Sequence, residues 1–136
     1  MFSAPAVTIH GIDHARAALR PGFPVVLLSA PGAALYAGCA WWAALIALAG
    51  LETTTPFTDL LDCADAPGPA MAALRIGLKH LILTPMCPAF PAVSAAATPL
   101  GAIVLPHRPA SLDLAEPGAA RHLAGWLQRD INPPLR

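Results

Sequence analysis

Charged side chains are scarce in this sequence of 136 residues, of which only 12% are Asp, Glu, Lys or Arg. Eight basic residues balance eight acidic ones, and the basic residues are spread along the whole chain. Proteins that bind nucleic acid concentrate basic side chains on one face or in one stretch. The composition therefore gives no electrostatic footprint for nucleic acid, and we expect no nucleic-acid partner.

Cysteine is also rare, and its spacing indicates no cross-link. Cys39, Cys63 and Cys87 are odd in number and far apart, and no Cys-x-x-Cys pair occurs. Disulfide frameworks and zinc ribbons both need paired, characteristically spaced cysteines. The first residues also lack the basic segment that opens a secretory signal. We therefore expect a cytoplasmic protein with reduced thiols, no metal ion and no cofactor.

No charged side chain occurs between residues 21 and 51, a run long enough to span a bilayer. The sequence Ser-Ala-Pro-Gly at 29–32 interrupts this run, and its second half is rich in alanine. Alanine drives membrane insertion only weakly, and neither flank carries a cluster of Lys or Arg to set an orientation. The sequence therefore favours a buried helix over residues 32–49 and no membrane partner.

This expected helix is apolar on nearly all sides and contains Trp41 and Trp42. A surface helix is normally apolar along one stripe only. Because 56% of the chain is hydrophobic, part of its apolar surface is expected to be buried against another subunit. The sequence thus predicts a homodimer that forms through residues 32–49, with a helix buried wholly inside one subunit as the alternative.

Short apolar runs alternate with alanine-rich stretches along the chain. Strands are expected at residues 7–10, 25–28, 59–63, 80–84 and 102–105, helices at 13–19, 32–49, 69–78, 92–97 and 118–130, and a loop at 109–116. Such alternation favours parallel strands joined by right-handed crossovers, and the length suits one domain. The sequence predicts a single three-layer α/β domain over residues 1–136. Its mainly parallel five-stranded sheet would have helices on both faces and a flavodoxin-like size.

Polar side chains follow the expected strand ends, where ligands bind in open α/β sheets. Turns are polar in proteins generally, so the same pattern would also arise without a site. At residues 29–33 the chain enters a helix N-terminus, whose free N–H groups attract anions. The sequence predicts a binding or sensing domain that holds a compact polar or anionic metabolite at this rim. The predicted ligand-binding residues are Ser29, Gly32, Ala33, Asp62, Asp65, Thr84, His107 and Arg108.

Two other classes of function remain open. The first is a small lyase or hydrolase in which Asp62 acts with His10 or His107 as the acid–base pair. A nucleophilic mechanism is less favoured, because no Gly-x-Ser-x-Gly elbow surrounds Ser29. The second is a structural or assembly protein that acts through the apolar helix bearing Trp41 and Trp42.

One segment resembles a known enzyme family. The sequence LLDCAD at 60–65, ALRIG at 73–77 and HLIL at 80–83 is similar to one βα unit of class II aldolase barrels. The resemblance implies an acid–base role for Asp62, and Cys63 stands where that family has a zinc-binding histidine. As a whole, the chain also resembles small uncharacterised bacterial α/β proteins of similar length, which implies a fold and no activity.

Overall fold

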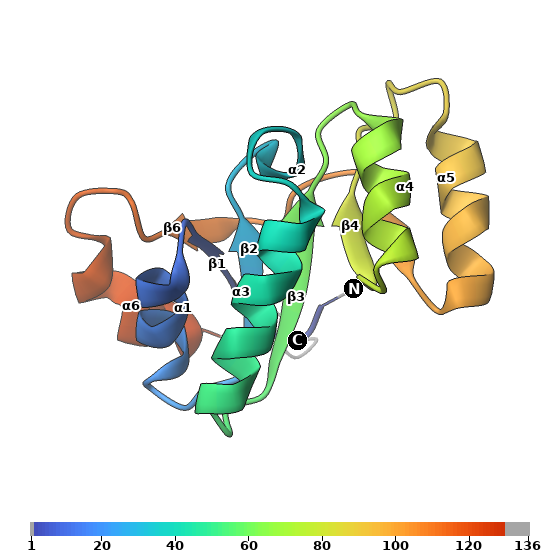
Figure 1. The fold of residues 1–136 in the computed structure, drawn as a ribbon. Coiled ribbons are helices and arrows are strands. Elements are labelled where there is room, and N and C mark those ends of the chain that lie inside the picture. The colour runs from blue at the N-terminus through green and yellow to red at the C-terminus, as the bar shows by residue number, and fades with distance from the viewer. Residues whose placement is uncertain (1, 130–136) are drawn as a thin grey trace, which may run out of the picture.

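A computed structural model describes residues 2–129 and arranges them as one sheet with a layer of helices (Figure 1). The strands are β1 (Ala6–Ile9), β2 (Val25–Ser29), β3 (Phe57–Asp62), β4 (His80–Ile82), β5 (Ile103–Leu105) and β6 (Ser111–Asp113). The helices are α1 (Ile12–Leu19), α2 (Ala33–Tyr36), α3 (Cys39–Glu52), α4 (Pro67–Arg75), α5 (Phe90–Ala97), the 3-10 turn η1 (Thr98–Leu100) and α6 (Ala119–Leu127). Residue 130, the last residue of the expected final helix, lies outside the described residues.

All neighbouring strands run parallel, in the order β5-β4-β3-β2-β1-β6. The α/β class and the parallel sheet are therefore confirmed, but the sheet has six strands where the sequence predicted five. The additional strand, β6, falls inside the expected loop at 109–116 and pairs with β1, so that Val7 lies beside Leu112. A three-residue strand with two polar side chains has no hydrophobic pattern of its own, and its partner is about 100 residues away in the chain.

Within residues 2–129 the helices with buried side chains pack on one face of the sheet, where the sequence predicted helices on both faces. That face presents Val7, Leu27 and Leu61, and these belong to one large core cluster that includes buried residues of α1 to α6. The physical reason is the strand order. From β1 to β5 each strand is added on the same side of the previous one, and right-handed crossovers then place all connecting helices on one face.

The opposite face of the sheet, which is covered by none of the helices in residues 2–129, carries a separate apolar cluster. Its strand residues alternate with those of the large core, as the two-residue period of a strand requires. Phe2 and Ala4 of the N-terminal segment pack against this cluster, and Phe2 makes an edge-on contact with the ring of His80. The buried residues of the cluster are Ala6, Val26, Leu28, Leu60, Ile82 and Leu105.

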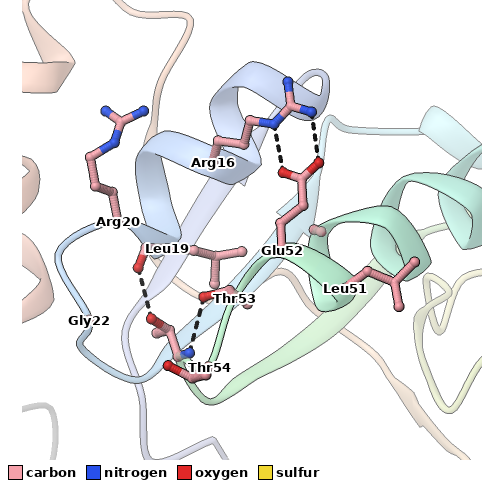
Figure 2. A pocket seen from close by; sticks show the side chains of 10 residues that line it. Arg16, Leu19, Arg20, Gly22, Leu51, Glu52, Thr53 and Thr54 are labelled. Atoms are coloured by element: carbon pink, nitrogen blue, oxygen red, sulfur yellow. Dashed lines mark hydrogen bonds and ion pairs between the residues drawn. The ribbon is translucent and has the colours of Figure 1, made fainter.

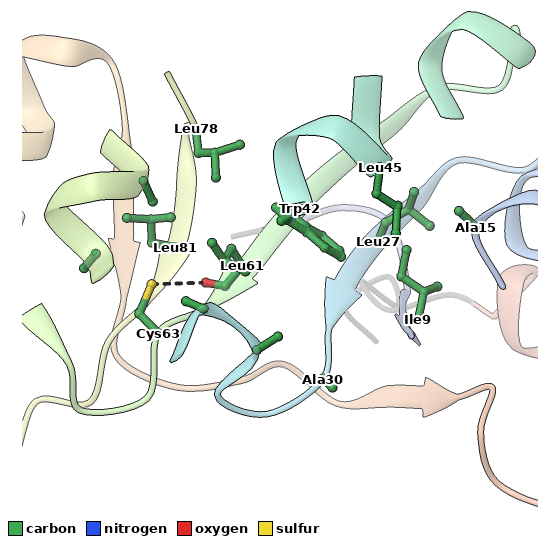
Figure 3. Packing of buried hydrophobic residues seen from close by; sticks show 14 of the residues in the cluster. Ile9, Ala15, Leu27, Ala30, Trp42, Leu45, Leu61, Cys63, Leu78 and Leu81 are labelled. Carbon is green, nitrogen blue, oxygen red and sulfur yellow. Dashed lines mark hydrogen bonds between the residues drawn. The ribbon is translucent and has the colours of Figure 1, made fainter. Parts of the chain in front are cut away.

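The helix expected over residues 32–49 is divided in the structure. Helix α2 ends at Tyr36, and α3 begins at Cys39 after Gly38, whose φ of 89° lies in the left-handed region that favours glycine. Within α3, Trp42 is fully buried beside Leu27 and Leu61 (Figure 3). Its indole Nε1–H donates to Asp59 Oδ2 at 3.4 Å, so the largest core side chain also satisfies its polar atom.

Helix α3 is the longest helix in the described part of the chain, with 14 residues. At 1.5 Å per residue it extends about 21 Å, against about 30 Å for the hydrocarbon core of a bilayer. Within residues 2–129 no helix combines the length and the apolar character needed to span a membrane. The uncharged run of the sequence is long enough to span a bilayer, but the break at Gly38 divides its helical part into α2 and α3.

Candidate functional site

A cavity of about 340 Å³ lies at the carboxyl ends of the central strands. We call it the rim cavity. Four separate segments form it: the loop after β2, the end of β3 with its following turn, the end of β4, and the segment after β5. Its lining residues are Pro31, Gly32, Asp62, Ala64, Ile82, Thr84, Pro106, His107 and Arg108.

One wall of the rim cavity comes from residues 106–110, which we call the strap. The strap joins β5 at one edge of the sheet to β6 at the other, and it is the orange segment that passes across the strands in Figure 1. In a doubly wound sheet, helices on opposite faces open the binding crevice. Here the helices share one face, so the strap supplies the second wall.

Arg108 fixes the strap across three strands. Its Nη1 donates to Asp62 Oδ2 at 2.7 Å and to the carbonyl oxygen of Ser29 at 3.0 Å. Its Nη2 donates to Thr8 Oγ1 at 3.1 Å, and that hydroxyl lies 2.7 Å from Ser111 Oγ. Within residues 2–129 these contacts use three of the five donors of the guanidinium group.

Asp62 is held on both carboxylate oxygens. Its side chain is 5% exposed; Oδ2 accepts from Arg108, and Oδ1 accepts the backbone N–H of Ala64 at 2.8 Å. The latter bond closes a tight turn in which Ala64 takes a positive φ of 50°, uncommon for a residue with a side chain. The carboxylate of Asp62 therefore organises the rim cavity before any ligand arrives.

The structure brings together five of the eight predicted ligand-binding residues: Gly32, Asp62, Thr84, His107 and Arg108 all line the rim cavity. Among them His107 is exposed, and Thr84 is half-buried with its Oγ1 accepting the N–H of Met86. These two side chains and the guanidinium group of Arg108 are the groups best placed to contact a bound molecule.

The other three predicted residues do not line the cavity. Ser29 is fully buried behind it, where its Oγ accepts the N–H of Asp62 and donates to the carbonyl of Ala30. Ala33 is buried, and its N–H donates to Ala30, so it offers no free donor to an anion. Asp65 is exposed in the turn after β3. Because α2 has only four residues, the anion-binding helix start expected at 29–33 does not form.

An imidazole–carboxylate pair is present, but with a partner that sequence reasoning missed. His10 Nε2 lies 2.7 Å from Asp113 Oδ1, and the backbone N–H of His10 donates to His14 Nδ1. Burial alone would raise the pKa of Asp113, but hydrogen bonds from the Ala115 N–H and from His10 outweigh it, and the pKa is lowered. Only recognition of β6 as a strand beside β1 could have placed Asp113 next to His10.

Cys63 faces the helix layer, away from the carboxylate of Asp62. It is fully buried, and burial, followed by the nearby charges of Asp62 and Cys39, raises its thiol pKa to about 12. A thiol acts as a nucleophile or a metal ligand only as the thiolate. Cys63 therefore serves as a small core side chain, and within residues 2–129 no three His, Cys, Asp or Glu side chains are grouped to hold a metal ion.

A second, larger cavity of about 680 Å³ lies at the opposite end of the sheet, between the ends of α1 and α3 (Figure 2). Arg16 and Glu52 form a bidentate ion pair there, with Nε donating to Oε2 at 2.7 Å and Nη2 donating to Oε1 at 2.8 Å. Thr55 Oγ1 donates to the carbonyl of Leu19. Hydrogen bonding to Glu52 raises the pKa of Arg16, and the same bond lowers the pKa of Glu52. Since both helices end here, their negative dipole ends disfavour an anion.

No protein-family model and no curated protein sequence matches this chain. The chemistry of the site itself therefore has to support any functional assignment.

Proposed function

We propose that this chain is a binding or sensing domain that holds a compact polar or anionic small molecule in the rim cavity. The observation that carries the proposal is the convergence of Thr84, His107 and Arg108 on one cavity from separate strand ends. A volume of about 340 Å³ is at the small end of the range for ligand sites. The ligand would therefore have the size of a small metabolite.

The lining favours an acceptor-rich ligand. Within residues 2–129 two N–H donors of Arg108 have no partner and His107 is exposed, while the charges of Asp62 and Arg108 offset each other at 2.7 Å. Ile82, Pro106 and Pro31 give the cavity apolar walls around these few polar groups. A carboxylate or phosphate on a small carbon skeleton matches both parts of this lining.

The test is a binding measurement with defined probes: inorganic phosphate, pyruvate and malate, each followed by thermal shift and by amide chemical shifts. We expect at least one probe to raise the melting temperature of the wild-type protein and to shift amides at 31–32, 62–64, 82–84 and 106–108. His107→Ala should weaken that binding, whereas His122→Ala, which removes an exposed imidazole on α6, should not.

The proposal fails if none of the probes perturbs those amides, or if His107→Ala and Thr84→Val both leave the affinity unchanged. These two variants are chosen because Asp62 and Arg108 hold the strap, so substitutions there change the fold together with the cavity. Thr84→Val keeps the shape of the side chain and removes its hydroxyl.

A second candidate function is acid–base catalysis, and the pairing of His10 with Asp113 at 2.7 Å favours it. A carboxylate that orients an imidazole is the arrangement that general-base catalysis uses. The pairs expected from the sequence are not hydrogen-bonded: Asp62 accepts instead from the N–H of Ala64 and from Arg108. Under this candidate, Asp113→Asn should abolish turnover of a bound probe without weakening its binding.

We further propose that the protein works in the cytoplasm. Its three cysteines are free thiols, and two of them, Cys63 and Cys87, are buried in the core. Free buried thiols are typical of a reducing compartment. Alkylation of intact cells followed by mass spectrometry would show disulfide-bonded cysteines if the proposal is wrong.

A further inference from the structure

The central helix of the helix layer, α3, has an apolar outer face. It packs between α1 and α4, with Trp42, Leu45 and Ala49 buried against the sheet. Beside this buried stripe, Trp41, Leu48 and Leu51 remain 37%, 43% and 87% exposed. A surface helix normally places charged or polar residues on its outer side. Glu52, its last residue, is the one charged residue of α3.

Helix α2 extends this apolar face. Leu35 and Tyr36 are 51% and 71% exposed, and they precede α3 by only a few residues. We name the face formed by Leu35, Tyr36, Trp41, Leu48 and Leu51 the α2–α3 surface. With roughly 200 Å² for each large side chain, these exposed fractions correspond to roughly 600 Å² of apolar area. A patch of that size lies at the upper end of what typical monomers expose, and such patches are often functional.

Three exposed alanines lie along the middle of the α2–α3 surface. Ala40, Ala44 and Ala47 are spaced by four and three residues, so they share one side of α3. These small side chains lie beside a ridge of the larger Trp41 and Leu48, which are seven residues apart, and we call the strip of alanines the alanine groove. A groove next to a ridge lets a second helix approach closely, as in ridges-into-grooves packing.

The composition of this surface favours a second copy of the chain as its partner. The run from residue 21 to residue 51 carries no charge, so a charged partner would lose hydration without gaining an ion pair. A two-fold axis across α3 would bring the Trp41–Leu48 ridge of each copy into the alanine groove of the other. Together with the alanines, the available area approaches the roughly 800 Å² per subunit that stable interfaces bury.

We propose that the α2–α3 surface is the interface of a homodimer in which the α3 helices of the two copies pack antiparallel across a two-fold axis. The proposal is independent of ligand binding, because Arg108, His107 and Thr84 do not belong to this surface. Antiparallel packing also sets the two helix dipoles in opposition, which is electrostatically favourable.

The test is sedimentation velocity across a concentration series, supported by light scattering. Wild-type protein should sediment at twice the 14.0 kDa mass of the chain at micromolar concentration. Ala44→Glu and Leu48→Glu place a charge in the groove and on the ridge, so each should raise the dimer dissociation constant by about 30-fold or more. Circular dichroism spectra of both variants should match that of the wild type.

Leu100→Glu is the matched control, since Leu100 is 48% exposed against 43% for Leu48 and lies on η1, outside the α2–α3 surface. It should leave the dimer intact. If either glutamate variant fails to fold, the milder Trp41→Ala and Leu48→Ala should still weaken dimerisation by about tenfold.

The concentration series should extend to about 100 micromolar. A wild-type protein that is still monomeric at that concentration would overturn the proposal. So would a dimer that Ala44→Glu and Leu48→Glu leave unchanged. Binding of the monomer to neutral phosphatidylcholine vesicles through Trp41, seen as a blue shift lost in Trp41→Ala, would assign this surface to a lipid boundary instead.

Discussion

Arg108 Nη1 lies 2.7 Å from Asp62 Oδ2, and this contact joins the strap to the end of β3 across 46 positions of sequence. The same guanidinium reaches Ser29 on β2 and Thr8 on β1. One side chain thus ties together the carboxyl ends of three strands. These contacts explain how a five-residue connection can hold a defined path from β5 across the sheet to β6.

Replacing Arg108 should destabilise the fold. Arg108→Ala leaves the carboxylate of Asp62 buried, at 5% exposure, without its ionic partner. We expect a loss of about 2–4 kcal/mol in the free energy of unfolding, measured by urea denaturation. Arg20→Ala, which removes an exposed guanidinium, should change it by less than about 0.5 kcal/mol. A loss below about 1 kcal/mol for Arg108→Ala would show that the contact does not hold the strap.

The double variant Arg108→Ala with Asp62→Asn isolates the contact itself. Removing the buried charge together with its partner should recover part of the lost stability, because no unpaired carboxylate remains. If the loss of stability in the double variant equals the sum of the losses in Arg108→Ala and Asp62→Asn, the two side chains act independently.

Asp59→Asn should stabilise the protein at neutral pH. Burial raises the pKa of Asp59 above its ordinary value of 3.8, against the opposing hydrogen bond from Trp42. The folded state therefore binds the proton more tightly than the unfolded state, and stability falls as pH rises from about 3.8 through the raised pKa. Asparagine keeps an acceptor for the indole N–H and has no charge to bury.

We expect the melting temperature of Asp59→Asn to exceed that of the wild type by a few degrees at pH 7. The gain should shrink towards pH 3, where Asp59 is protonated in both states. Asp65→Asn changes an exposed carboxylate and serves as the control. The expected direction would be contradicted if the stability difference between Asp59→Asn and the wild type were less favourable to the variant at pH 7 than at pH 3.

Two glycines should respond to alanine in opposite directions. Gly38 separates α2 from α3 at a φ of 89°, so Gly38→Ala should cost about 1–2 kcal/mol of stability although no atom obstructs the new methyl group. Gly125 lies within α6 with open space around it, so Gly125→Ala should gain about 0.5–1 kcal/mol. Thermal denaturation measures both, and a stabilising Gly38→Ala would mean that residues 33–52 can form one continuous helix.

The three thiols should differ in reactivity. Cys39 is partly exposed, whereas Cys63 and Cys87 are buried and the pKa of Cys63 is raised to about 12. Under native conditions at pH 8, iodoacetamide should alkylate Cys39 at least about tenfold faster than Cys63. Peptide mass spectrometry over a time course gives the rates; equal rates would show that the core around Cys63 opens readily.

The sequence alone determined the class of this fold and the edge of the sheet where polar groups gather. Apolar runs separated by alanine-rich segments require parallel strands with helical crossovers, and strand ends are where turns place polar residues. For that reason Gly32, Asp62, Thr84, His107 and Arg108 could be assigned to one rim before their contacts were known.

Tertiary structure decided the rest, because strand order and short-strand pairing depend on contacts between residues far apart in the chain. Winding from β1 to β5 in one direction put the crossover helices α1 to α5 on one face, and no local sequence pattern reports that choice. Pairing of β6 with β1 brought Asp113 to His10, and the path of the strap brought Arg108 to Asp62. Each of these contacts closes a loop of many residues, which costs conformational entropy. In the folded chain the contacts form together, so one ordering of the backbone serves all of them.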